Sequence, residues 1–140
     1  MTKGIMFDTN KSYSETATFD MLTADKISAY DRAGKYIDSF NVGDIVFYYI
    51  KGRGIVAAGE ICSETMQCEY YESTEKYKMV KILTPLNMPK NEVELKCISP
   101  SRIKKLLDRN FYWASTIKTP FLDKEQCECI IAELQTLYGE

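Results

Sequence analysis

Residues 42–50 of the chain read VGDIVFYYI, a run of β-branched and aromatic residues that opens on a Gly-Asp turn. Residues 51–54, KGRG, interrupt the run, and residues 55–61, IVAAGEI, continue the apolar pattern. Apolar runs joined by a short glycine-containing loop predict a β-hairpin. Because the apolar residues are nearly continuous, we expect both faces of this hairpin to be covered, as in a small barrel flanked by helices.

The second run of the hairpin carries little side-chain bulk at Ala57, Ala58 and Gly59. Small residues inside a strand indicate that another group approaches its backbone closely. That group is either a second backbone or a bound ligand. In the second case the thinned wall would leave a slot for a flat heterocycle.

The segments around the hairpin predict further strands and one short helix. We expect a short strand at residues 4–7, a polar loop at residues 12–18 and a short helix at residues 20–30, whose apolar positions fit the helical period loosely. Residues 111–117 predict a strand or an extended segment.

A further strand is predicted over residues 76–83, because polar and apolar residues alternate there. The alternation puts Lys78, Val80 and Ile82 on one face and Tyr77 and Met79 on the other. Prolines that follow at positions 85 and 89 end the strand.

Helices are predicted in the C-terminal part of the chain. Ser99 as N-cap and Pro100 at the first helical position begin one of them, with Ile103, Leu106 and Leu107 as its apolar stripe. Asp123 caps the other, whose stripe is Cys127, Ile130, Ile131, Leu134, Leu137 and Tyr138. Strands around a central hairpin with flanking helices predict an α+β domain with a compact, barrel-like sheet.

The composition restricts the chemistry of the chain. It has 140 residues, 45% of them apolar and 27% charged, which suits one globular domain. It has no histidine, which excludes Ser-His-Asp and Cys-His catalysis and imidazole ligands to zinc. Its five cysteines lack a C-x-x-C spacing, so we expect reduced structural thiols and neither a metal nor another cofactor.

Two acidic pairs, Glu69/Glu72 and Asp20/Asp25, are candidates for paired catalytic carboxylates, and a solvated surface is the alternative for both. The sequence shows neither a secretory leader nor an apolar run long enough to cross a bilayer. We therefore expect a cytoplasmic protein.

The hairpin as a whole resembles the central part of EVE domains. Residues 42–49, VGDIVFYY, and residues 51–61, KGRGIVAAGEI, are similar to the Gly-Asp strand and the glycine-containing return strand of that family. The order that follows is similar too: a lysine-rich strand, a short helix, and residues 110–113, NFYW, leading into a terminal helix. Residues 27–30 resemble a segment that forms a pocket wall, and the resemblance spans about residues 25–138.

EVE domains belong to the PUA-like superfamily, together with PUA, ASCH and YTH domains. The resemblance therefore implies that residues 1–140 form one PUA-like domain, a small mixed β-barrel with flanking helices. It also implies a nucleic-acid partner, DNA or RNA, of which the domain would hold a single nucleobase, often a modified one, in an aromatic-lined pocket. Stacking on an aromatic ring would stabilise the base, and hydrogen bonds to its edge would discriminate between bases.

The candidates for the base pocket are Ala29, Tyr30, Tyr48, Tyr112, Trp113 and Ser115. Tyr30 and Trp113 are favoured among them, because their segments resemble the pocket walls of the family. For each aromatic residue the alternative is a place in the core, and for Ser115 it is a hydrogen bond to the backbone. Many EVE domains carry a tryptophan near their N-terminus, whereas Trp113 is the only one in this chain.

A nucleic-acid partner requires a basic surface for its phosphates, and the charges of this chain are unevenly distributed. The chain has a net charge of −2, but residues 72–118 contain ten Lys or Arg and five Asp or Glu. A basic segment of this kind is typical of phosphate contacts, and a solvated helix face is the alternative. The phosphate-contact candidates are Lys51, Arg53, Arg102, Lys104, Lys105, Arg109 and Lys118.

We expect a binding module without enzymatic activity, and two alternatives remain open. ASCH domains share the architecture, and some are ribonucleases that use Lys, Tyr or Arg in place of His. In this chain the candidate catalytic residues would then be Lys51, Tyr48 or Arg53, with the lysine stabilising the charge on the transferred phosphate. The other alternative is a pocket for a nucleotide-like small molecule, or a surface for a protein partner.

Overall fold

The computed structural model describes residues 3–9, 17–30, 37–50, 52–70, 73–107 and 122–140. Its strands are β1 (Gly4–Asp8), β2 (Lys26–Tyr30), β3 (Ile45–Ile50), β4 (Gly54–Ile61), β5 (Met66–Tyr70) and β6 (Ser73–Thr84). Its helices are α1 (Ala17–Thr23), α3 (Pro100–Leu107) and α5 (Lys124–Tyr138), with a short 3-10 helix η2 (Glu92–Glu94). The predicted α+β class is confirmed.

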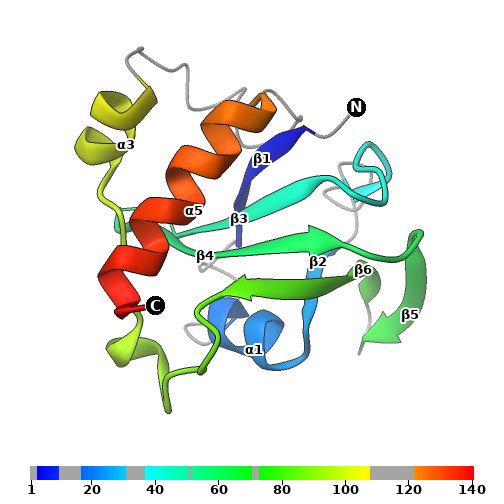
Figure 1. Ribbon diagram of the computed structural model, residues 1–140. Helices are drawn as coiled ribbons and strands as arrows, with labels where there is room; N and C mark the ends of the chain where they lie inside the picture. The colour runs from blue at the N-terminus through cyan, green and yellow to red at the C-terminus, as the bar shows by residue number, and fades with distance from the viewer. Residues whose placement is uncertain (1–2, 10–16, 31–36, 51, 71–72, 108–121) are drawn as a thin grey trace.

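The described strands form one curled, mixed sheet of six strands (Figure 1). Strand β1 runs parallel to β3, and the other neighbours in the order β1-β3-β4-β6-β2 are antiparallel. Strand β6 bonds along both edges. Its first half pairs with β5 on one edge and β2 on the other, and its second half pairs with β4. This shared strand curls the sheet into a half-barrel.

The hairpin of β3 and β4 lies between two apolar cores, and every residue of β3 is buried. One core, here the inner core, is lined by α1 and takes Val46, Tyr48 and Ile50 of β3. The other, the outer core, takes Ile45, Phe47 and Tyr49 of the same strand. Helices α3 and α5 cover the outer core (Figure 1). The expectation that both faces of the hairpin are covered is confirmed.

The small residues of β4 are explained by the neighbouring strand. Ala57 packs in the inner core and Ala58 in the outer core. A Cβ atom at Gly59 would overlap the Val80 side chain and come within 3.1 Å of the Lys81 carbonyl oxygen, both on β6. The close approach is therefore made by the protein itself. The alternative of a slot for a heterocycle at this point is wrong.

The helix predicted at residues 20–30 is wrong in its second half. Helix α1 ends at Thr23, and Asp25 adopts a left-handed conformation with φ of 53°. Strand β2 then begins at Lys26 and pairs with β6. Residues 26–30 form a strand because Ile27 and Ala29 alternate with Ser28 and can pair with β6. This pairing outweighs the loose helical period of the sequence.

The predicted C-terminal helices are confirmed. In α3, the Ser99 hydroxyl accepts a hydrogen bond from the Arg102 amide at 3.2 Å. In α5, the Asp123 carboxylate accepts from the Gln126 amide at 2.8 Å, and the Gln126 side chain accepts from the Asp123 amide at 3.0 Å. These caps satisfy amides that the first turn of each helix leaves without partners.

The strands predicted at residues 4–7 and 76–83 are confirmed as parts of β1 and β6. Residues 111–117 and most of the predicted loop at 12–18 lie outside the described residues, and the last two residues of that loop belong to α1. Within the described ranges, no helix is long and apolar enough to cross a membrane.

Candidate nucleic-acid interface

Strands β2 and β6 bring several charged side chains beside the predicted pocket wall. In the antiparallel register Ala29 lies opposite Lys76, and Tyr30 lies opposite Glu75. Because side chains alternate along a strand, Lys76 and Lys78 share one face of the sheet with Ala29. Glu75 lies on the other face of the sheet, with Tyr77.

On the inner face, the Lys78 side chain is the most deeply buried cation of the described residues. The residue is 1% exposed, and its ammonium group donates a hydrogen bond to the Phe40 carbonyl oxygen. Lys76 lies nearer the surface and forms an ion pair of 2.9 Å with Asp38. Hydrogen bonds from Lys76 and from the Thr65 hydroxyl hold the pKa of Asp38 below its ordinary value. The inner face therefore carries one buried and one accessible lysine.

On the outer face, Glu75 is the centre of a polar cluster. Its carboxylate lies 2.6 Å from the Lys26 ammonium and accepts a hydrogen bond from the Cys68 thiol at 3.2 Å. Burial raises the pKa of Glu75, but the hydrogen bonds from Lys26, Cys68 and Ser28 outweigh burial and bring the pKa below its ordinary value. The hydrogen bond to Glu75 in turn raises the pKa of Cys68. The Lys26 ammonium also lies 5.0 Å from the centroid of the Tyr77 ring.

The structure describes part of the predicted base pocket. Ala29 is buried in the inner core, and the backbone of Tyr30 ends β2. Tyr48 is fully buried, and its hydroxyl donates a hydrogen bond of 2.6 Å to the Lys26 carbonyl oxygen. Burial raises the pKa of Tyr48 well above its ordinary value. Its ring therefore has the core position that was the alternative for each aromatic residue.

The remaining predicted pocket residues, Tyr112, Trp113 and Ser115, lie outside the described residues, as does the side chain of Tyr30. The described residues therefore do not bring the whole predicted pocket together. They show the backbone of β2, the segment predicted to form a pocket wall, and the charges of β6 beside it.

The predicted phosphate contacts fall into different environments. Arg53 is half-buried and donates a hydrogen bond of 2.8 Å to the Leu95 carbonyl oxygen. Arg102 donates to both carboxylate oxygens of Glu133, at 3.0 and 3.3 Å. Lys104 and Lys105 lie in the last turn of α3, and within the described ranges neither forms an ion pair. The candidates Lys51, Arg109 and Lys118 lie outside the described residues.

Sequence reasoning missed the charged residues of β2 and β6. The signal for Lys78 was present, because the alternation of residues 76–83 put it on the same face as Val80 and Ile82. Its partner Phe40 is far away in the sequence, so the burial of the ammonium group could not be anticipated. Among the described residues, no group of three or more Cys, Asp or Glu could hold a metal ion.

Known proteins resemble this chain in structure and not in sequence. No protein-family model matches the sequence, and no curated protein matches it. Among solved structures, the chain is similar to the Mmi1 YTH domain, with a TM-score of 0.58 at 7% identity over 97% of this chain and 75% of that chain. It is also matched by a Pseudomonas putida structural-genomics protein, with a TM-score of 0.47 at 13% identity over 94% of this chain and 97% of that chain. The likeness to the YTH domain confirms the predicted fold, a curled mixed sheet with a few flanking helices.

Proposed function

We propose that the chain binds nucleic acid, DNA or RNA, and holds a single modified nucleobase beside the Ala29–Tyr30 end of β2. The observation that carries the proposal is the register of β2 against β6. It sets the accessible Lys76 directly opposite Ala29, in the segment that resembles a pocket wall. The PUA-like fold, and the resemblance of the hairpin to EVE domains, support the same reading.

In this proposal the base and the phosphates are held by different groups. Stacking on Tyr30 and Trp113 would contribute about 1–3 kcal/mol per base. The ammonium group of Lys76 would contact a phosphate, since its side chain is 32% exposed and its partner Asp38 is 47% exposed. An exposed ion pair is worth little, so a phosphate can compete with Asp38 for the lysine.

The test is a titration of the purified chain with fluorescent single-stranded oligonucleotides that carry methylated or unmethylated adenine or cytosine. We expect tighter binding to one methylated strand and affinity that falls with salt. The Lys76→Ala change should lower the slope of log affinity against log salt by about 0.7, as expected for one lost phosphate contact. Lys81→Ala is the matched control, because Lys81 is exposed on the other face of the same strand.

Two outcomes would count against the proposal. Equal, weak and salt-insensitive binding of every oligonucleotide would contradict nucleic-acid binding itself. Loss of affinity in a Lys104→Ala/Lys105→Ala double variant, with Lys76→Ala unchanged, would move the phosphate contacts to α3.

We further propose that the chain acts by binding rather than by catalysis. The ribonuclease alternative would use Lys51, Tyr48 or Arg53. Two of these have structural partners, because the hydroxyl of Tyr48 and the guanidinium of Arg53 both donate to backbone carbonyl groups. Cleavage of labelled single-stranded RNA by the chain, abolished by Lys51→Ala, would overturn this part of the proposal.

We also propose a cytoplasmic location. The thiols of Cys62, Cys68 and Cys129 are exposed and free. Exposed free thiols persist in a reducing compartment. Fractionation of cells that express the chain, followed by thiol labelling, would test this: recovery outside the cytoplasm with oxidised cysteines would contradict it.

A further inference from the structure

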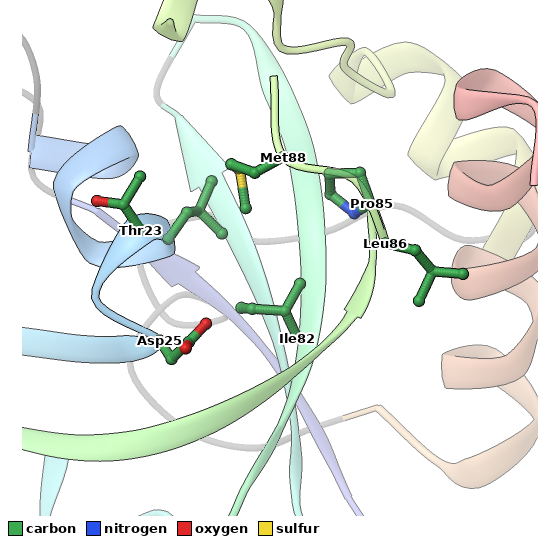
Figure 2. A pocket seen from close by; sticks show the side chains of 7 residues that line it. Thr23, Asp25, Ile82, Pro85, Leu86 and Met88 are labelled. Atoms are coloured by element: carbon green, nitrogen blue, oxygen red, sulfur yellow. The ribbon is translucent and has the colours of Figure 1, made fainter. Parts of the chain in front are cut away.

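A hollow of about 270 Å³ lies at the opposite end of β2, between the end of α1 and the segment that follows β6 (Figure 2). Five of its seven lining residues are apolar, among them Leu22, Ile82, Leu86 and Met88, and the other two are Thr23 and Asp25. Figure 2 shows Ile82 and Met88 pointing into the hollow from opposite sides, with the Asp25 carboxylate turned toward the same space.

The backbone holds Asp25 at the rim of this hollow. Its amide donates to the Leu22 carbonyl oxygen at 3.2 Å, and its own carbonyl accepts from the Val80 amide at 2.8 Å. The residue adopts φ of 53°, a left-handed conformation that Asp and Asn tolerate better than most residues. Its carboxylate is exposed and has no hydrogen-bond or ion-pair partner within the described ranges.

The opposite wall of the hollow is anchored by the end of the chain. The Glu140 carboxylate accepts a hydrogen bond from the Thr84 hydroxyl at 2.7 Å and another from the Leu86 amide. These bonds fix the turn after β6, on which Pro85 and Leu86 border the hollow. The hollow is therefore built from anchored backbone on both sides.

The charges of the lining indicate what the hollow would accept. The Thr23 hydroxyl is already used, because it donates to the Asp20 carbonyl oxygen at 3.1 Å. No lysine or arginine is among the lining residues, so the unpaired Asp25 carboxylate is the charge that a ligand would meet. An apolar body with one positive charge complements this surface. The volume is below the roughly 300–1,000 Å³ of sites for drug-sized ligands, so a small group fits best.

We propose that this hollow binds an alkylammonium group, with the alkyl part against Ile82 and Met88 and the ammonium group at Asp25. Such a group comes either from a small free amine or from a lysine side chain of a partner protein. The site is independent of the proposed nucleic-acid interface. It lies at the other end of β2, about 16 Å away at the usual rise of a strand, and it attracts the opposite charge.

The test is an NMR titration of the full ¹⁵N-labelled chain with n-butylammonium chloride, and with n-butanol as the neutral analogue. We expect shifts at the amides of Leu22, Thr23, Asp25, Ile82 and Leu86. At low salt the ammonium should bind about two- to fivefold more tightly than the alcohol, the range for an exposed ion pair. Added salt should reduce this preference.

Asp25→Asn is the decisive variant, because asparagine has the same shape and also tolerates the left-handed conformation. It should bind the ammonium and the alcohol equally. Glu64→Gln, which removes an exposed carboxylate in the segment between β4 and β5, should keep the preference. Equal binding of both probes by the wild type, a preference that survives Asp25→Asn, or shifts confined to another surface would overturn the proposal.

A third probe, N-acetyl-lysine N-methylamide, distinguishes the sources of the group. Tighter binding of this probe than of n-butylammonium would support the proposal with a protein lysine as the natural ligand. Tighter binding of n-butylammonium would support it with a free amine.

Discussion

The two ends of β2 border surfaces of opposite chemistry. At its start, Asp25 faces an apolar hollow with an unpaired carboxylate. Along its length and at its end, the charges of β6 are paired: Glu75 binds Lys26, and Lys76 binds Asp38. Lys26 directly follows Asp25 in the sequence, yet its ammonium group bonds to Glu75 on the neighbouring strand. Proximity along the chain therefore does not decide which charges neutralise each other; the pairing of the strands does.

The largest expected effect concerns Lys78, the buried cation on β6. Lys78→Ala removes a buried stem and leaves the Phe40 carbonyl without its donor. We expect the free energy of unfolding to fall by about 2–4 kcal/mol in urea denaturation. Lys76→Ala, on the same face but in a surface ion pair, should cost less than about 1 kcal/mol. Equal losses for the two variants would contradict the different roles assigned to them.

A smaller loss of stability is expected when the hydrogen bond between Tyr48 and the backbone of β2 is removed. Tyr48→Phe removes the hydroxyl that donates to the Lys26 carbonyl oxygen in the core. Leaving this acceptor unsatisfied should lower the free energy of unfolding by about 1–2 kcal/mol. Tyr77→Phe keeps the ring beside Lys26 and should change it by less than about 0.5 kcal/mol. If Tyr48→Phe were as mild as Tyr77→Phe, the hydrogen bond would not be structural.

The paired charge of Glu75 should also make the free energy of unfolding depend on pH in the acidic range. The pKa of Glu75 is lowered in the folded state, so its contribution is present above the unfolded value of about 4.5 and is lost as the pH falls through the folded value. Glu75→Gln should therefore be less stable than the wild type by about 1 kcal/mol at pH 7, with the difference shrinking below pH 4.5. Urea denaturation at several pH values measures this difference.

A second measurement on the same variant follows the Cys68 thiol. Because Glu75 raises the pKa of Cys68, Glu75→Gln should increase its rate of alkylation by iodoacetamide. The exposed Cys129 on α5 is the internal reference. A stability difference that does not change with pH, together with an unchanged Cys68 rate, would show that the charge of Glu75 is unimportant.

The smallest expected effect is at the acidic end. Asp25→Asn should change the free energy of unfolding by less than about 0.5 kcal/mol, since the backbone conformation is kept and no ion pair is lost. Oligonucleotide affinity should also stay unchanged, because the phosphate contacts are assigned to the other end of β2. Fluorescence titration of the variant measures this affinity. A marked change in oligonucleotide affinity would mean that Asp25 belongs to the nucleic-acid interface and that the two sites are not separate.

The sequence predicts what is encoded locally. The β3–β4 hairpin, the caps of α3 and α5 and the alternation of β6 could all be read from neighbouring residues. Strand β2 could not, because its identity as a strand depends on β6, about fifty residues further along the chain. The same limit applies to the site: Tyr48 reads equally well as a pocket or a core residue until the Lys26 carbonyl is placed beside its hydroxyl.

The bonds from Glu140 to Thr84 and Leu86 have a thermodynamic consequence. They connect the end of α5, which packs on the outer core, to the turn that borders the hollow. Any occupant that displaces this turn must also disturb the anchoring of α5. By reciprocity, a partner that loosens the end of α5 would strengthen the binding of such an occupant, by the same factor as the occupant strengthens the binding of that partner. The helix on one face of the sheet and the cavity beside the other are thus linked as a two-site system.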